Sequence, residues 1–249
     1  MIRAVNLSFQ YPGQGPGEVA LSGLDFAVEP GCLVCVLGGN GSGKSTLLAL
    51  LAGLFSDFTG SLQVGGLDLS TAAPEARKLA GLVPQNPDLY LLGSTLQEDM
   101  LLGFSRVERD DAALLARAEA LAREFGLAGL EQRPLQTLSF GQRRKASLAA
   151  ALMREPRLLL LDEPFSGLDF EAQLHLRRII QESRRQGLTQ LVVAHDLDLI
   201  ADLADGFLLL KGGRIIGQGD REEVFPQLQG ANVRPPCWWL AGQAGPQFL

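Results

Sequence analysis

CLVCVLGGNGSGKSTLLALLAGLF, residues 32–55, is the stretch that decides the fold. Residues 32–37 form an apolar run that predicts a buried strand, and residues 46–55 predict an apolar helix. Between them, Gly38–Ser45 fits the pattern G-x-x-x-x-G-K-[ST], which requires a strand before it and a helix after it. A strand joined to a helix in this way favours an α/β fold.

The residue types of this loop suit the binding of a nucleoside triphosphate. Glycines let the backbone curl so that successive N–H groups face the phosphates, Lys44 would neutralise the β and γ oxygens, and Ser45 would offer a hydroxyl to Mg²⁺. A glycine turn with a surface lysine is the competing interpretation, and the flanking strand and helix make it the weaker one. The expected nucleotide-binding residues are Gly38, Gly39, Asn40, Gly41, Ser42, Gly43, Lys44, Ser45 and Thr46.

A second apolar run, Leu158–Leu161, ends in the carboxylates Asp162 and Glu163. Ligands of a parallel sheet bind at the carboxyl ends of its strands, so Asp162 would lie beside the glycine loop and hold Mg²⁺ through water. Glu163 would polarise a water for attack on the γ-phosphate, a general-base role typically worth about 10² to 10⁴ in rate. The alternative is a strand that merely ends in an exposed acidic turn.

Three single residues give weaker signals. His195 closes the run QLVVAH. A lone His is more often structural, but at the end of a core strand its side chain would reach the γ-phosphate. Gln85, in LVPQNPD, offers a neutral amide that could sense Mg²⁺ or water. Tyr11 lies at a predicted strand end, where its ring could stack on adenine or only cover a sheet.

A second helix start raises a separate question. In LSFGQ, residues 138–142, Ser139 occupies the cap position of an apolar-periodic helix over 139–153. A helix start has backbone N–H groups without intrahelical partners, and these attract anions. The chain thus has one nucleotide loop but two helix starts suited to phosphate.

The remaining pattern alternates strands with helices, which predicts a mostly parallel sheet covered on both faces. Residues 2–11 and 19–29 predict an antiparallel pair around the turn PGQGPG, and 61–69 predict a hairpin with a Gly-Gly turn. Further expected elements are helices over 110–127 and 171–186, strands in RLLLLDEP and QLVVAH, a short helix from Asp196 and two strands in FLLLKGGRIIGQG. The expected units are a core over 1–85 and 155–224, a helical insertion over 86–154 and a proline-broken tail over 225–249.

Composition narrows the class of protein. An apolar content of 46% in 249 residues can build a sizeable core. The net charge of -6 argues against a nucleic-acid-binding surface, which usually needs a basic stripe. The three cysteines, Cys32, Cys35 and Cys237, are too few for a disulfide framework and favour a reducing compartment. Cys32 and Cys35 would face opposite sides of one strand as buried structural thiols.

The sequence contains no window that approaches the roughly 18 to 20 apolar residues of a membrane helix. The first residues, MIRAVNLSFQY, alternate like a strand rather than forming a secretory leader. If the protein acts at a membrane, we expect it to do so by contacting a partner.

Six segments, in this order along the chain, resemble the nucleotide-binding subunit of ATP-binding cassette (ABC) transporters. They are GGNGSGKST, LVPQNPD, LSFGQ, LLLLDEP, SGLD and VVAHD, and the resemblance covers about residues 2–224. It implies a P-loop NTPase (RecA-like) core with a mostly parallel sheet, an antiparallel β subdomain and an inserted helical subdomain. It also implies ATP hydrolysis with Mg²⁺, an adenine-stacking role for Tyr11, and a D-loop at Ser166–Asp169.

The same resemblance implies how the second helix start is used. In a head-to-tail dimer, Ser139, Gly141 and Gln142, together with Asp169, would contact ATP held by the second ATPase subunit, which is the same or a similar chain. Loss of the γ-phosphate would then open the interface. The family usually has Gly at position 140. Phe140 is tolerable if its side chain turns away from the nucleotide and its φ is not positive.

Residues 85–103, QNPDLYLLGSTLQEDMLLG, are similar to the Gln-loop region of energy-coupling-factor importer ATPases. Those proteins drive the uptake of vitamins or of cobalt and nickel ions. The matching Thr-aliphatic-acidic stretch is Thr95, Leu96, Glu98 and Asp99. The resemblance implies a peripheral subunit on the cytoplasmic face of the membrane, with this segment forming a groove for a helix of an integral membrane partner.

Two other functions are weaker interpretations. A soluble ABC-type ATPase of DNA repair or chromosome organisation would carry a long coiled coil between its nucleotide motifs, and no heptad series lies between Lys44 and Asp162. A small-molecule P-loop kinase would use Lys44 and Asp162 but leave LSFGQ and His195 without a role.

Overall fold

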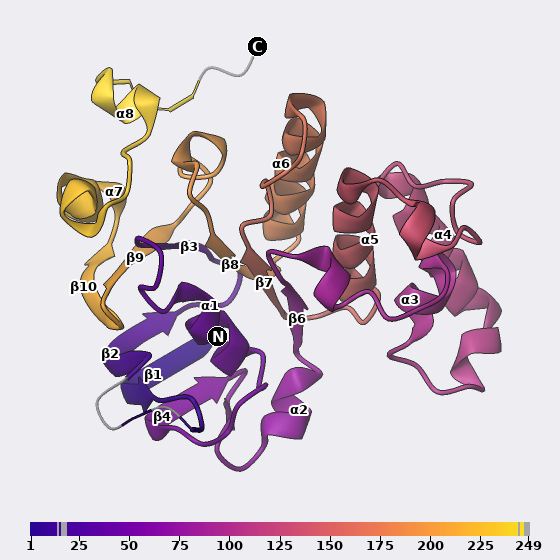
Figure 1. Cartoon of the computed structure of the whole chain (residues 1–249), viewed down its shortest axis with the longest axis horizontal. Coiled ribbons are helices and arrows are strands. Elements are labelled where there is room, and N and C mark those ends of the chain that lie inside the picture. The colour runs from indigo at the N-terminus through magenta and orange to yellow at the C-terminus, as the bar shows by residue number, and fades with distance from the viewer. Residues whose placement is uncertain (14, 16–18, 244, 247–249) are drawn as a thin grey trace.

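The structure is a computed structural model that describes residues 1–13, 15, 19–243 and 245–246. Its larger sheet has the strand order β10-β9-β3-β8-β7-β6 (Figure 1). The pairs from β9 to β6 are parallel, and β10 pairs antiparallel with β9. The strands are β3 (Leu33–Leu37), β6 (Ala80–Val83), β7 (Leu158–Asp162), β8 (Thr189–Val193), β9 (Gly206–Lys211) and β10 (Arg214–Gly219). The expected mostly parallel sheet is confirmed.

The smaller sheet is antiparallel and has the order β2-β1-β4-β5. Its strands are β1 (Ile2–Phe9), β2 (Leu21–Val28), β4 (Thr59–Val64) and β5 (Leu67–Asp68). The predicted pair and the predicted hairpin, with Gly65 and Gly66 at its turn, are both confirmed. Half of the predicted turn PGQGPG, at 14, 16 and 17, lies outside the described residues.

Helix α1 (Lys44–Leu51) packs between the two sheets, as Figure 1 shows. Its leucines share one apolar cluster with Ile2 of the small sheet and with Val34 of β3. The alternate β3 residues belong to a second cluster on the other face of the large sheet. Because β3 is buried on both faces, the loop that follows it is held in a fixed place.

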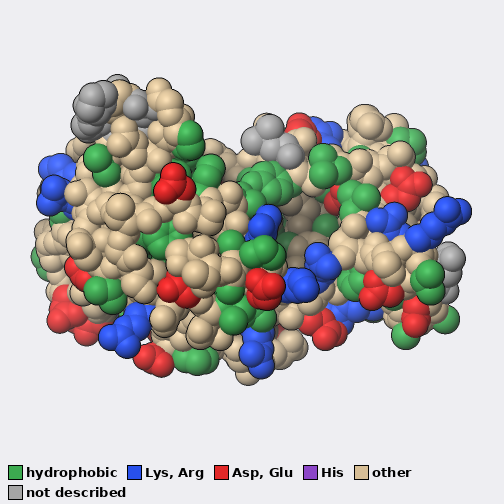
Figure 2. Space-filling model, turned by 90° about the horizontal axis from the view of Figure 1, so that it is seen from below, with side chains coloured by type: hydrophobic (Ala, Val, Ile, Leu, Met, Phe, Trp, Pro, Cys, Tyr) green, Lys and Arg blue, Asp and Glu red, His purple; other side chains and the backbone are tan. Residues whose placement is uncertain are grey.

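That second cluster contains residues of α5 (Phe140–Leu152) and α6 (Phe170–Arg185). Helices α3 (Leu96–Leu101), α4 (Ala112–Glu124) and α5 form a lobe at the right of Figure 1. Seen from below, the molecule is hollowed between this lobe and the larger body, with Lys and Arg side chains at the rim (Figure 2). Short elements complete the described chain: α2 (Ala73–Arg77), α7 (Arg221–Val224), α8 (Cys237–Leu240), and 3-10 turns at Pro87–Leu89, Glu108–Asp110, Leu135–Thr137, Leu197–Leu199 and Phe225–Ala231.

Strand β6 was not predicted from the sequence. Its four residues, Ala80–Val83, include Gly81 and carry no clear alternation. Its place at the sheet edge depends on pairing with β7, which is distant in the sequence. The C-terminal segment, predicted as a proline-broken tail, places Phe225, Leu228 and Trp238 in the buried core cluster.

The cysteine prediction holds in its main point. All three cysteines are free, and Cys35 is buried in the cluster opposite to the one that Cys32 packs against. Burial raises the pKa of Cys35, and the Asp202 carboxylate adds to the effect. Cys32 is only partly buried. The C-x-x-C spacing therefore does not bring two thiols together.

Candidate functional site

The glycine loop Gly38–Ser45 leaves β3 and enters α1. Gly43 is the N-cap of α1 and has a left-handed φ of 101°. A Cβ on Gly43 would lie 2.6 Å from Leu21 Cδ2, so only glycine fits. In the described part of the chain, no side chain caps this helix start. Its first N–H groups are therefore open to an anion.

Lys44 lies inside the loop rather than on the surface. Its side chain is buried, and its Nζ donates hydrogen bonds to Gly38 O at 2.8 Å and Gly39 O at 2.9 Å. Burial lowers the pKa of Lys44, whereas the carboxylates of Glu163 and Asp162 act in the opposite direction. A phosphate in the loop could replace the two carbonyl contacts with a charge-assisted contact.

Asp162 ends strand β7 and is buried. Burial raises its pKa, and a hydrogen bond from the Ser45 side chain acts in the opposite direction. Hydroxyl, carboxylate and phosphate oxygens are ligands that Mg²⁺ prefers. No three His, Cys, Asp or Glu side chains among the described residues cluster as a metal site. The residues present fit an ion that shares its coordination with a nucleotide.

Side chains from two other loops contact the Glu163 carboxylate. Gln85 Nε2 donates to Glu163 Oε2 at 2.7 Å, and His195 Nε2 lies 2.9 Å from Glu163 Oε1. Glu163 also has a φ of 49°, a conformation that L-residues rarely adopt. Strained backbone of this kind is typical of functional sites. Sequence reasoning singled out these three side chains, and the structure brings them together.

A cavity of about 590 Å³ extends from the glycine loop to Gln85 and Glu163, and His195 is not among the residues that line it. Tyr11 lies at this cavity, with its hydroxyl 2.9 Å from Thr46 Oγ1 and its ring packed edge-on against Phe9 and Phe55. The cavity is lined by Tyr11, Val19, Ala20, Asn40, Gly41, Ser42, Gly43, Lys44, Ser45, Thr46, Gln85 and Glu163. Ser42 Oγ is buried without a hydrogen-bond partner among the described residues.

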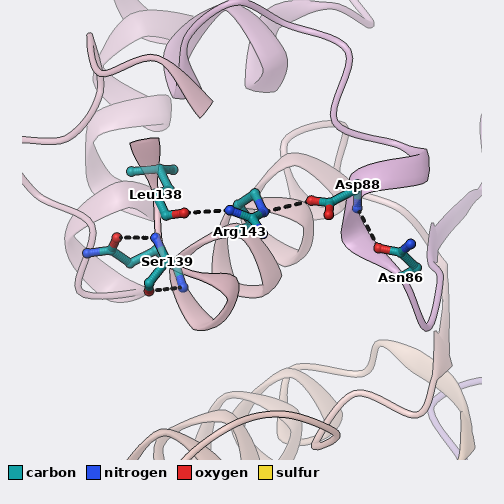
Figure 3. A network of polar contacts seen from close by, with 6 residues as sticks. Asn86, Asp88, Leu138, Ser139 and Arg143 are labelled. Atoms are coloured by element: carbon teal, nitrogen blue, oxygen red, sulfur yellow. Dashed lines mark hydrogen bonds and ion pairs between the residues drawn. The ribbon is translucent and has the colours of Figure 1, made fainter. Parts of the chain in front are cut away.

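The second helix start does not line this cavity. Ser139 caps α5: its Oγ accepts from Gln142 N at 3.2 Å, and Gln142 Oε1 accepts from Ser139 N at 2.9 Å (Figure 3). A Cβ on Gly141 would lie in van der Waals contact with Leu168 of the D-loop. Asp169 caps α6 by accepting from Ala172 N at 2.8 Å. These predicted partner-contact residues thus lie together, away from the cavity of their own chain.

Phe140 meets the condition that its φ is not positive. It is the first residue of α5 and is absent from the described non-glycine residues with positive φ. Its ring, on a side chain 39% exposed, lies against Gly167, where a Cβ would come within 2.5 Å of Phe140 Cε1. The phenylalanine therefore does not require a left-handed backbone conformation, and its ring packs against Gly167 of the D-loop.

Sequence analysis missed Arg144, which is fully buried. Its guanidinium donates to Pro84 O and Gln85 O, both at 2.5 Å, and to Glu163 O at 3.3 Å. In the sequence it stands in the polar run QRRK at a helix start, where arginines are usually exposed. No signal in the sequence separates it from its neighbours.

A glycine loop between a buried parallel strand and a helix, with carboxylates at the end of another parallel strand of the same sheet, defines a P-loop nucleotide-binding protein. The chain belongs to the family of ABC transporter ATP-binding domains, because the model of that family, described as ABC transporter, matches residues 21–166. It is an ATPase subunit of this family. In the described part of the chain, no helix has the length and apolar character needed to cross a membrane.

Several relatives carry more specific names. An energy-coupling factor transporter ATP-binding protein, EcfA, of Carboxydothermus hydrogenoformans is 36% identical over 217 residues, which cover 87% of this chain and 79% of the relative. EcfA of Methanocaldococcus jannaschii is 31% identical over 242 residues, covering 95% and 86%. The solved structure of CbiO1 from Clostridium perfringens, described as part of the ABC transporter complex CbiONQ, is 28% identical, with a TM-score of 0.75 and 94% coverage of both chains.

Proposed function

We propose that this chain is the ATP-hydrolysing subunit of an energy-coupling-factor importer that takes up a vitamin or a metal ion. It would work as a head-to-tail ATPase dimer on integral membrane partners at the cytoplasmic face of the membrane. The EcfA and CbiO1 relatives support this assignment, as does the segment QNPDLYLLGSTLQEDMLLG. The proposal keeps the division into an ATPase domain over 1–224, with its insertion over 86–154, and a short tail over 225–249.

The observation that carries the dimer is the separation of the two helix starts. No residue of the segment 138–142 lines the cavity at the glycine loop. Ser139, at the start of α5, is nevertheless exposed. A second chain facing the first would bring such a helix start to the open side of the cavity. ATP would then be bound by both chains, and its hydrolysis would weaken the contact between them.

The geometry supports a division of roles within one site. Tyr11 would stack on adenine, and the loop N–H groups with Lys44 would hold the phosphates. Gln85 and His195 hold the Glu163 carboxylate from two sides, which places it for proton transfer. A water would attack the γ-phosphorus, its proton would pass to Glu163, and the bond from the γ-phosphorus to the leaving oxygen of ADP would break.

Mg²⁺ would be held through Ser45, Asp162 and Gln85 and would neutralise charge on the phosphate oxygens. The chain's own part is to supply the hydroxyl and the carboxylate already in contact with each other. The contact between His195 and Glu163 also disfavours a kinase, in which neither side chain would have this role.

Exposed apolar side chains support a membrane partner on the helical insertion. Leu92 is 79% exposed and Val107 is 86% exposed, while Tyr90 and Leu102 are also exposed. Tyr90, Leu92 and Leu102 belong to the segment that resembles the Gln-loop region of importer ATPases, and Val107 follows shortly after it. Exposed apolar residues gathered on one segment are typical of an interaction surface.

The first test is the mass of the Glu163→Gln protein in solution with ATP-Mg²⁺ and with ADP, measured by light scattering. This substitution keeps the hydrogen-bonding shape but removes the base, so ATP should stay intact. A dimer with ATP and a monomer with ADP is the expected result. A monomer in both states would overturn self-association and require a different ATPase chain as the partner. Equal turnover of Glu163→Gln and the parent would remove Glu163 from the base role.

A further inference from the structure

Two consecutive arginines of α5 reach the same short loop from different sides. We define the Gln loop as residues 84–88 and the signature segment as residues 138–142. Neighbouring residues of a helix point about 100° apart. Arg143 and Arg144 both contact the Gln loop, which precedes them by more than fifty positions in the sequence. The structure therefore joins two segments that the chain separates.

Arg143 connects the outer part of the Gln loop to the signature segment. Its Nη1 donates to Leu138 O at 2.5 Å, and its Nε lies 2.6 Å from Asp88 Oδ1, close enough for an ion pair but outside hydrogen-bond geometry (Figure 3). Asp88 is held in turn, because its N–H donates to Asn86 Oδ1 at 3.0 Å. Leu138 directly precedes the cap residue Ser139. One guanidinium thus touches both the Gln loop and the backbone that positions the cap.

Arg144 holds the inner part of the same loop. Its guanidinium binds the carbonyls of Pro84 and Gln85 on the Gln loop and the carbonyl of Glu163 at the end of β7. Burying a charge is costly unless it is well compensated. Burial lowers the pKa of Arg144, whereas the carboxylates of Asp162 and Glu163 act in the opposite direction and favour its charged form. A residue needed only for packing would not require this charge.

We propose that Arg143 and Arg144 are positioning residues that couple the Gln loop to the signature segment. In this arrangement, a displacement of Gln85 away from Glu163 also moves the backbone in front of Ser139. The site on one chain and the helix start offered to the other chain then change together. This inference rests on the proposed function, since Ser139 acts there on nucleotide held by a second chain.

The ion pair between Arg143 and Asp88 is the part that a variant can test without unfolding the protein. The Asp88 side chain is about half exposed and that of Arg143 is 22% exposed, so the pair adds little to stability. Arg143→Met keeps much of the apolar stem and removes the charge. The matched control is Arg123→Met, which breaks the exposed pair of Arg123 with Glu119 on α4 of the same insertion.

The expected result is a split between binding and turnover. Arg143→Met should lower kcat about tenfold, as residues that couple two sites commonly do, and change the KM for ATP by less than about twofold. Arg123→Met should leave both constants at the parent's values. Equal kcat for Arg143→Met and the control would overturn the proposal.

Amide hydrogen exchange of the nucleotide-free chain separates this proposal from the proposed function. Arg143→Met should speed exchange in both the Gln loop and the signature segment, whereas Arg123→Met should affect neither. Arg144→Lys should do the same more strongly, because one ammonium cannot bind three carbonyls in the guanidinium geometry. If Arg143→Met speeds exchange in both segments but the Glu163→Gln protein forms no ATP-dependent dimer, the coupling of the two segments is supported and the proposed dimer is refuted. If exchange is unchanged in both segments, the link itself is overturned.

Discussion

Helices α1 and α5 both begin within sequence motifs that contain glycine, but their first turns are completed differently. The start of α1 has a left-handed glycine cap, no side-chain cap among the described residues and the buried Lys44 beside it. The start of α5 is closed by a capping box between Ser139 and Gln142 and has no acidic residue in its first turn. An open helix start needs an external anion to satisfy its N–H groups, whereas a closed one is stable alone.

This difference has a functional meaning in the proposed dimer. The α1 start can hold phosphate in a single chain, because its N–H groups and its lysine are already in place. The α5 start can bind phosphate only when a nucleotide held by another chain approaches the exposed Ser139. Binding of nucleotide and dimer formation would therefore be separate steps, and substitutions at the two helix starts should affect different measurements.

The largest expected effect is that of Lys44→Ala. Loss of a charge-assisted hydrogen bond costs about 1.5 to 3 kcal/mol, or roughly 10- to 150-fold in affinity. We expect this loss in the affinity of the isolated chain for ATP, measured by titration with a fluorescent nucleotide. Lys78→Ala, at an exposed lysine, is the control. Unchanged ATP affinity of Lys44→Ala would contradict the role assigned to the α1 start.

Gly167→Ala tests the surroundings of the α5 start. The added Cβ would approach the Phe140 ring, and the φ of 74° is unfavourable for alanine. We expect a loss of about 1 to 3 kcal/mol in the free energy of unfolding, measured with urea. In the background of Phe140→Ala the steric part of this cost should vanish and the backbone part remain. An equal cost in both backgrounds would show that the ring does not cover Gly167.

Ser139→Ala should act on the dimer rather than on the cavity. Removal of the cap costs about 1 kcal/mol of stability. The ATP-dependent dimer of the Glu163→Gln protein should weaken about tenfold, because one charge-assisted contact to phosphate is lost. ATP affinity of the isolated chain should change less than about twofold, since Ser139 lies outside the cavity of its own chain. A large loss of that affinity would place Ser139 at its own nucleotide and refute the separation of the two helix starts.

Asp220→Ala gives the smallest expected effect and isolates the value of a capping box. Asp220 and Glu223 form at the start of α7 the same reciprocal hydrogen bonds as Ser139 and Gln142. We expect a loss of about 0.5 to 1 kcal/mol in the free energy of unfolding and no change in the ATP-dependent dimer. A weaker dimer would mean that capping alone accounts for the effect of Ser139→Ala.

The sequence by itself determined the glycine loop, the carboxylates after β7 and the alternation that gives the parallel sheet. These features depend on local spacing: buried strands are continuous apolar runs, and the loop pattern fixes which groups face a phosphate. Gln85 and His195 were placed at strand ends by the same logic, which the contacts with Glu163 support. The likeness to a known family then supplied the expected roles.

Only the tertiary structure decided the parts that depend on distant segments. Strand β6 exists through its pairing with β7, and the C-terminal segment is ordered by burying Phe225 and Trp238 in the core. An arginine in a polar run at a helix start is usually exposed, but the Arg144 guanidinium binds three backbone carbonyls from two other loops. Spacing along a chain specifies local geometry, whereas burial and the satisfaction of buried polar groups depend on which segments the fold brings together.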